Sequence, residues 1–399
     1  MRLLTTILIL TLVNSALFAQ PLKKVLPESV GMSSVHLEYA DSAIEKEISS
    51  GHIPGAVLAV VKDGAIAYIK AYGKKSLTPS IEPMDENTIF DLASCTKSVS
   101  TAISAMILVE RGKLSLRDNL DLYIPDFNKT KSYNGRRCTI KIGDLMTHTS
   151  GITSYVSPKT LQSKYGKSDA KALIEYTKSA NLEYETGKDF KYSCINYILL
   201  QYIIEQITKQ SLQEFANENI FDKLQMNNTD YLPLEWADKS DIAPTEVVSR
   251  DSVIRGVVHD PLAYHVNNGV SGNSGLFSTA SDLAILATTI LSGGIYNGKR
   301  ILSPITVDAM CRVPNKVASF GRALGWDVSS AYSSNIGDLF GDGSFGHTGF
   351  TGCSITLDKE HNVAVILLTN GIHAKEYESK YMVRLRALVA NCVAASIYN

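Results

Sequence analysis

The N-terminal part of the chain shows a helical pattern followed by two β-rich runs. Apolar residues recur at helical spacing over residues 34–50 and stop at a glycine, which predicts an amphipathic helix. The runs 55–64 and 65–73 are rich in aliphatic and aromatic residues and meet at Asp63-Gly64. Because Asp-Gly is a favoured turn between two strands, these runs predict a β-hairpin.

From Thr101 to about residue 300 the pattern is mostly helical, with clear helical runs at 102–111, 170–178 and 197–208. β-rich runs return at 353–358 and 362–369, and an amphipathic stretch at about 375–396 predicts a last helix.

Strands at both ends with helices between them predict a single sheet built from both termini, flanked by helices, with an all-helical region inserted. We expect the α/β part to span about 25–92 and 300–399, and the helical part about 100–299.

The first nineteen residues differ from the rest of the chain. Arg2 precedes an apolar run at 3–13, and small residues lead to Ala19. This pattern predicts a secretory signal peptide over 1–19 and a mature chain over 20–399 that is exported, to the periplasm or the medium. The alternative is an anchor that stays attached. No second apolar stretch is long enough to span a membrane, so we expect no stable span after cleavage.

Composition excludes some classes of partner. Of the 399 residues, 39 are Lys or Arg and 40 are Asp or Glu, so no basic excess indicates nucleic-acid binding. The six cysteines are widely spaced, and they form neither a CxxC nor a zinc-binding pattern with histidine. We therefore predict no metal and no cofactor. The sequence leaves the oligomeric state open.

The first chemical motif is Ser94-Cys-Thr-Lys97, at the start of a stretch with helical spacing. Positions i and i+3 share a helix face, so Lys97 can reach Ser94. A serine hydroxyl needs such a base to become a nucleophile. A second Ser-x-x-Lys at Ser168–Lys171 has no supporting context, which shows that the motif alone is weak evidence.

Two further motifs support the first. Tyr192-Ser-Cys194 lies in a loop that runs into a helix, and His347-Thr348-Gly349-Phe350 precedes the strand at 353–358. In this order, the three motifs resemble those of the serine β-lactamase and penicillin-binding protein superfamily. The resemblance extends through Leu145–Ile152, Gly256–Asp260 and Gly269–Thr279, and it favours the branch that holds class C β-lactamases, D-alanyl-D-alanine carboxypeptidases and esterases.

The resemblance implies a β-lactamase/transpeptidase-like α/β (α+β) fold with the site between the sheet and the helical region. It implies that Ser94 is the nucleophile and that the backbone N–H groups of Ser94 and Phe350 form the oxyanion hole. Lys97 acts as a base only when neutral, and a cation beside Tyr192 favours its phenolate, so the two are expected to titrate as a coupled pair. His347 completes the catalytic set, and Thr348 and Gly349 join the substrate-binding set.

The chain departs from the family pattern at two positions. Cys194 stands where many relatives have an asparagine that binds the substrate's amide, and Asn196 is a candidate to replace it in part. His347 stands where many relatives have lysine, and a histidine is mostly uncharged at neutral pH. His148 and His259 lie in family structural stretches, so we interpret both as structural.

We therefore expect an exported serine hydrolase that forms an acyl-Ser94 intermediate from a small-molecule or peptide substrate. The first hypothesis for its substrate is a cell-wall-derived peptide amide, as for an amidase or D-amino-acid peptidase. Resemblance to muramyl-peptide amidases in the Val-His-Asp and Leu-Phe-Ser-Thr stretches supports this hypothesis. The alternatives are an esterase or acyltransferase that passes the acyl group to an alcohol, a β-lactamase, and a non-catalytic penicillin-sensor module.

Overall fold

The central sheet takes strands from both ends of the chain. The computed structural model describes residues 22–398, so the predicted signal peptide lies outside the described residues. Six antiparallel strands follow the order β12-β13-β14-β1-β2-β3. Their bounds are β1 (Gly55–Lys62), β2 (Ala65–Ser76), β3 (Glu82–Pro83), β12 (Phe345–Thr348), β13 (Ser354–Asp358) and β14 (Val363–Leu368). This arrangement confirms the predicted hairpin and the predicted sheet from both termini.

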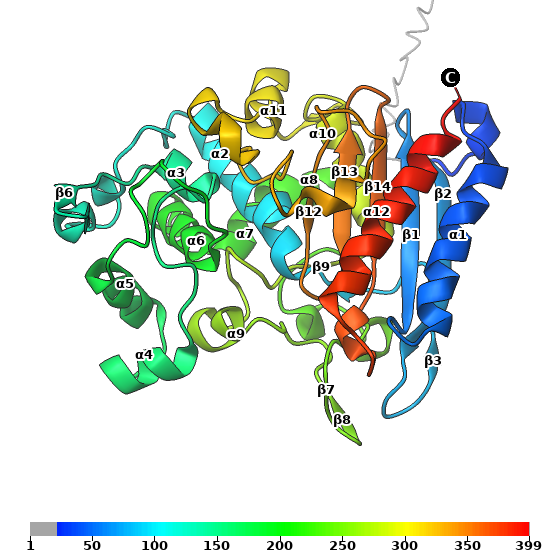
Figure 1. Ribbon diagram of the computed structural model, residues 1–399, viewed down its shortest axis with the longest axis horizontal. Coiled ribbons are helices and arrows are strands. Elements are labelled where there is room, and N and C mark those ends of the chain that lie inside the picture. Colours follow the sequence, from blue (N-terminus) through cyan, green and yellow to red (C-terminus); the bar gives the residue numbers. More distant parts are fainter. Residues whose placement is uncertain (1–21, 399) are drawn as a thin grey trace, which may run out of the picture.

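The sheet is covered on both faces, which explains why its central strands β1 and β14 are mostly apolar. Every residue of β1 is buried, as expected for a strand with helices on both sides. On one face α1 (Ser34–Ser49) and α12 (Ser379–Ser396) lie side by side, in blue and red in Figure 1. On the other face α10 (Ala280–Leu291) packs against β1 and β14, although sequence analysis placed this segment in the helical part.

The remaining α-helices lie beside the sheet, mostly on the left in Figure 1. They are α2 (Ile103–Glu110), α3 (Ile142–Met146), α4 (Pro158–Tyr165), α5 (Ala170–Ser179), α6 (Cys194–Thr208), α7 (Leu212–Ala216), α8 (Asp222–Leu224), α9 (Pro261–Asn267) and α11 (Pro304–Cys311). Four short pairs complete the chain: β4 (Phe90–Asp91) with β9 (Phe277–Ser278), β5 (Ser132–Tyr133) with β6 (Arg136–Arg137), β7 (Val247–Ser249) with β8 (Ser252–Val253), and β10 (Ile295–Tyr296) with β11 (Lys299–Arg300).

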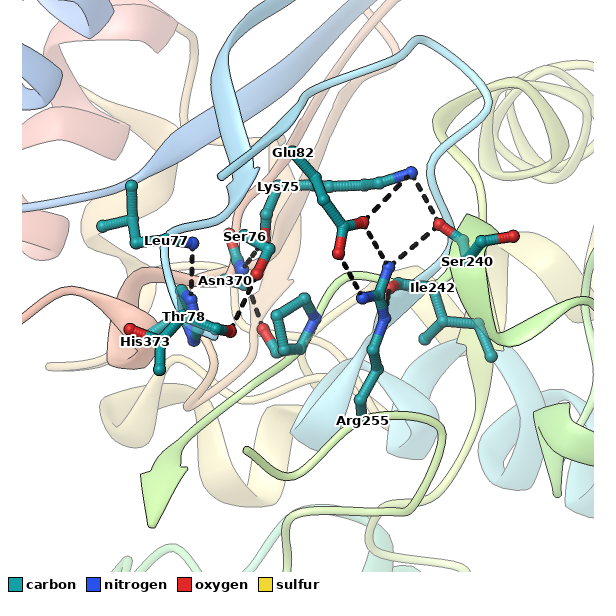
Figure 2. Close-up of polar contacts among 11 residues, drawn as sticks. Lys75, Ser76, Leu77, Thr78, Glu82, Ser240, Ile242, Arg255, Asn370 and His373 are labelled. Carbon is teal, nitrogen blue, oxygen red and sulfur yellow. Dashed lines mark hydrogen bonds and ion pairs between the residues drawn. The ribbon is translucent and has the colours of Figure 1, made fainter. Parts of the chain in front are cut away.

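A polar network joins the edge of the sheet at β2 and β3 to the segment 240–255, which lies between α8 and α9 in the chain (Figure 2). Arg255 donates to both carboxylate oxygens of Glu82, at 2.7 and 2.8 Å, and to the Ser240 carbonyl at 2.9 Å. Asn370, just after β14, donates to the carbonyls of Lys75 and Pro244, at 2.7 Å each. These contacts fix the 240–255 segment against β2 and β3. Within residues 22–398, no helix has the length and apolar character of a membrane span.

Candidate active site

Ser94 lies in a tight turn between β4 and the helix that leads into α2. Ala93 has a φ of 45°, an unusual value for a residue other than glycine. A 3₁₀ turn, Ala93–Cys95, is followed by the π-helical turn Lys97–Ala102, which continues as α2. Through this turn, Lys97 Nζ comes within 3.0 Å of Ser94 Oγ. The structure thus brings together the two residues of the first motif.

Lys97 is fully buried, and its ammonium group is surrounded by the second motif. Its Nζ donates to the Asn273 carbonyl at 2.9 Å and lies 3.7 Å from Cys194 Sγ. The same Nζ lies 4.8 Å from the centroid of the Tyr192 ring. Asn273 therefore holds the lysine between the serine and the tyrosine, a role that sequence analysis did not assign although it noted the stretch around Asn273.

The Tyr192 hydroxyl is buried and has no hydrogen-bond partner among the described residues. Burial raises the pKa of Tyr192 well above its ordinary value, and Cys194 acts in the same direction. The Ser94 hydroxyl and the Arg322 guanidinium oppose this rise in the pKa. Because burial dominates, the raised pKa keeps Tyr192 a neutral phenol in the free protein.

His148 positions the loop that carries Tyr192. Its Nδ1 accepts a hydrogen bond from the Ser193 backbone N–H at 3.0 Å, and its ring centroid lies 4.6 Å from that of Tyr192. Burial, reinforced by the charge of Arg322, lowers the pKa of His148 well below its ordinary value. The residue is thus a neutral structural element beside the tyrosine. His259 stacks on Phe350, with ring centroids 5.7 Å apart.

The third motif approaches the turn of Ser94 from β12. A Cβ atom at Gly349 would lie 2.5 Å from the Leu92 carbonyl oxygen, so only glycine allows this close approach. Arg386 of α12 donates through Nη2 to the Gly349 carbonyl at 2.8 Å and through Nε to the Gly352 carbonyl at 3.2 Å. The buried arginine holds the loop that carries Phe350, the residue assigned to the oxyanion hole.

His347 is a neutral hydrogen-bond acceptor at the cavity. Its Nδ1 lies 2.9 Å from the Thr348 carbonyl, which can only accept, so the proton is on Nδ1. Burial, with the charge of Arg322 in support, lowers the pKa of His347 to about 3. The side chain therefore brings no positive charge to the site at neutral pH.

A cavity of about 390 Å³ opens at the nucleophile. Ser94, Tyr192 and the third-motif residues His347, Thr348, Gly349 and Phe350 line it, together with Asp327, Tyr332 and Arg386. The Phe350 side chain is 63% exposed at this cavity. No group of three His, Cys, Asp or Glu side chains in the described part of the chain is placed to hold a metal ion.

Three other sequence candidates are not among the residues that line this cavity. Cys194 lies beside Lys97 and does not line the cavity. Asn196 is fully buried, and its amide bonds to the Ser150 hydroxyl at 2.8 Å and to the Leu145 carbonyl at 3.3 Å. Asn196 is 0% exposed and does not line the cavity, so we do not retain it as a replacement for the missing asparagine. Ser168 lines a different cavity, with His265.

Asp91 connects three segments of the site. Its carboxylate accepts from the backbone N–H groups of Ala93 and His259, at 2.8 Å each. Its carbonyl accepts from the Thr351 hydroxyl, also at 2.8 Å. Asp91 thus fixes the strained turn before Ser94, the segment of His259 and the third-motif loop. Sequence analysis missed it because only the fold brings these segments together.

Asp91 gives a testable pH dependence of stability. Burial raises its pKa from 3.8 to about 6 in the folded protein, so the folded protein binds this proton before the unfolded chain does as the pH falls. This proton therefore raises the free energy of unfolding as the pH falls from about 6 to 4. The contribution is lost again as the pH rises through 6. We expect the stability of the wild type relative to Asp91→Asn to increase by about 2 kcal/mol from pH 7 to pH 4. Denaturant unfolding at both pH values measures this, and a difference independent of pH would contradict the assignment.

A sheet flanked by helices, with a Ser-Lys pair and a tyrosine at a cavity beside it, defines a serine hydrolase of the penicillin-binding type. Residues 40–388 match the family described as Beta-lactamase, and the chain belongs to this family. An N-acetylmuramyl-L-alanine amidase of Bacillus subtilis (strain 168) is 33% identical to this chain, in an alignment that covers 87% of this chain and 83% of the amidase. A protein of Escherichia coli (strain K12) provisionally named a D-alanyl-D-alanine carboxypeptidase is 31% identical over 87% of this chain and 85% of its own.

Solved structures agree on the fold. The structure titled "EstCE1, a hydrolase with promiscuous acyltransferase activity" superposes with a TM-score of 0.71 at 22% identity, covering 89% of this chain and 99% of the other. At this identity the likeness establishes the β-lactamase/transpeptidase-like fold and no more. Family and fold together make this chain a serine hydrolase.

Proposed function

We propose that the protein hydrolyses a cell-wall-derived peptide amide through an acyl intermediate on Ser94, as an amidase or D-amino-acid peptidase does. The observation that carries the mechanism is the 3.0 Å contact between Ser94 Oγ and Lys97 Nζ, beside Tyr192 and at a cavity of about 390 Å³. The amidase and carboxypeptidase names of relatives more than 30% identical support the substrate class.

In the acylation step, Ser94 Oγ attacks the carbonyl carbon and its proton passes to the Lys97–Tyr192 pair. The carbonyl oxygen becomes an oxyanion, which the backbone N–H groups of Ser94 and Phe350 stabilise. The proton is then delivered to the leaving nitrogen, the C–N bond breaks, and the acyl group remains on Oγ. In the second half-reaction water attacks the acyl carbon and its proton passes to the same pair. The bond between the acyl carbon and Oγ then breaks, the pair returns the proton to Oγ, and the acid leaves.

Product analysis tests the substrate class. Purified muropeptides, p-nitrophenyl esters and a chromogenic cephalosporin are incubated side by side with the wild type and with Ser94→Ala. The proposal expects a new amine or D-amino acid from the muropeptides, released at a higher kcat/KM than the esters and absent with the variant. Turnover confined to esters would refute the peptide substrate and leave the nucleophile in place.

A second candidate is an esterase or acyltransferase that passes the acyl group to an alcohol. It is favoured by the exposed Phe350 ring, which gives the cavity an apolar wall, and by a thiol beside Lys97 where many relatives carry an amide side chain. Addition of an alcohol to the ester reaction separates the candidates, because an acyltransferase yields a new ester at the expense of the free acid.

The thiol at position 194 gives a prediction on specificity. Cys194 lies beside Lys97, with Sγ 3.7 Å from Nζ. A substrate amide that reaches past the cavity to this thiol loses its water without gaining a good partner, which costs about 1–3 kcal/mol. We expect Cys194→Asn to raise β-lactam acylation about 10-fold to 100-fold and to leave a short ester that carries no amide nearly unchanged. Cys194→Ser is the control, because it is polar but presents no amide. An equal effect of Cys194→Asn on both substrates would show that position 194 does not set the preference.

We also place the enzyme outside the cytoplasm. The support is the pattern of residues 1–19, with Arg2, the apolar run and Ala19. N-terminal sequencing of the protein recovered from the periplasm or medium is expected to begin at Gln20, and an intact Met1 would contradict cleavage.

A further inference from the structure

A buried ion pair lies next to the proposed base. Arg322 is 0% exposed and Asp327 1%, and the two side chains are in contact. The Ser330 hydroxyl donates to the same carboxylate. Burying such a pair removes two charges from water and adds little net stability over apolar residues of similar size. Its presence in an otherwise apolar stretch, with Leu324 and Trp326, indicates a role beyond stability.

The geometry directs this pair at Tyr192. The guanidinium carbon of Arg322 lies 5.8 Å from the centroid of the Tyr192 ring and 5.8 Å from that of Phe190. Arg322 Nε and Nη2 have no hydrogen-bond partner among the described residues, whereas Arg386 uses its guanidinium to hold backbone carbonyls. Asp327 lines the cavity that contains Ser94 and Tyr192.

The other groups around Tyr192 are mostly neutral. Burial keeps the pKa values of His148 and His347 low and that of the Cys194 thiol high. Burial also raises the pKa of Tyr197, and the Tyr332 ring centroid lies 5.2 Å from that of Tyr192. Among the described groups that face Tyr192 from the packed elements, the basic and acidic side chains are Lys97 of the π-helical turn and the ion pair of Arg322 and Asp327 in the segment before β12.

We propose that Arg322 is a positioning residue whose buried cation, balanced by Asp327, sets the protonation of the Lys97–Tyr192 pair that takes the proton of Ser94. This rests on the roles given to Ser94, Lys97 and Tyr192 under the proposed function. His347 stands where many relatives have lysine and is neutral, so Arg322 supplies a fixed cation near the tyrosine from another side of the site.

The two members of the ion pair act in opposite directions. The Arg322 cation favours loss of a proton from any group near it, and the Asp327 carboxylate opposes that loss. A charge at about 4–6 Å shifts the pKa of a neighbouring group by about one to three units. The direction of each pKa shift is the same whether Lys97 or Tyr192 accepts the proton when Ser94 Oγ bonds to its electrophile.

The test is the pH profile of the reaction of Ser94 with an uncharged fluorophosphonate, which has no titrating group of its own. We expect the rising limb of the rate to move up by at least about one pH unit in Arg322→Met and down by at least about one unit in Asp327→Asn. Arg322→Lys keeps the charge and is expected to leave the limb in place. The double variant Arg322→Met/Asp327→Asn removes both charges and is expected to lie near the wild type.

If Arg322 and Asp327 have only a structural role, all four variants react more slowly and the rising limb of the pH profile stays in place. That result would overturn the inference. Shifts of the same sign in Arg322→Met and Asp327→Asn would overturn it as well. Asp327→Asn retains an amide oxygen for Ser330 and Arg322, so it provides the test if Arg322→Met shows no cooperative thermal transition. Failure of the wild type to react at Ser94 would instead refute the proposed function.

Discussion

Replacement of Ser94 by alanine is expected to lower kcat/KM for an activated ester by at least about 10⁴-fold. The loss is this large because the alanine side chain has no oxygen to form the acyl intermediate, and Lys97 then has no proton to accept at this position. Steady-state rates with p-nitrophenyl acetate, with the uncatalysed rate subtracted, measure the effect.

Ser168→Ala is the matched control for Ser94→Ala. Ser168 also lies three residues before a lysine, but it lines a separate cavity with His265. We expect Ser168→Ala to retain the wild-type kcat/KM. Because each change is small, we expect both variants to keep the wild-type thermal unfolding midpoint within a few degrees. Activity that survives in Ser94→Ala and disappears in Ser168→Ala would reverse the assignment.

Lys97→Ala and Tyr192→Phe are each expected to lower kcat/KM by at least about 10²-fold, the size of a general-base contribution. The double variant is expected to lose far less than the product of the two single losses, because groups that share one proton-transfer task are not additive. The 4.8 Å between Lys97 Nζ and the Tyr192 ring centroid is the structural reason for this coupling.

A double-mutant cycle on kcat/KM measures the coupling. Lys97→Ala leaves a cavity in the core, so a cooperative unfolding transition of each variant is checked first. Multiplicative losses in variants that fold would mean that Lys97 and Tyr192 serve separate steps.

Sequence patterns predicted the sheet and the contact between Ser94 and Lys97 for physical reasons. The hairpin at Asp63-Gly64 was predictable because both turn residues have the positive φ that Asp-Gly turns favour. The Ser94–Lys97 contact was predictable because it is local in sequence. By contrast, α10 covers the sheet although it lies within the segment assigned to the helical part, since a helical pattern does not say which surface the helix will cover.

The misplaced and missed residues depend on tertiary structure. Asn196 follows Cys194 by two residues at the start of α6, and two residues turn a helix by about 200°, which directs Asn196 away from Lys97. Arg322, Asp327 and Arg386 come from segments more than 100 residues beyond Tyr192 in the chain. No local pattern marks them, because their role arises only where β12 and α12 meet the turn of Ser94.

The most direct test of the account is to locate the covalent intermediate. Wild-type enzyme is mixed with a p-nitrophenyl ester, quenched in acid within the burst phase, and examined by intact mass and by peptide mapping. The account predicts a mass increase equal to one acyl group, confined to the peptide that contains Ser94 and absent from Ser94→Ala. An acyl group on Cys194 or Ser168, or turnover with no acylated peptide, would contradict it.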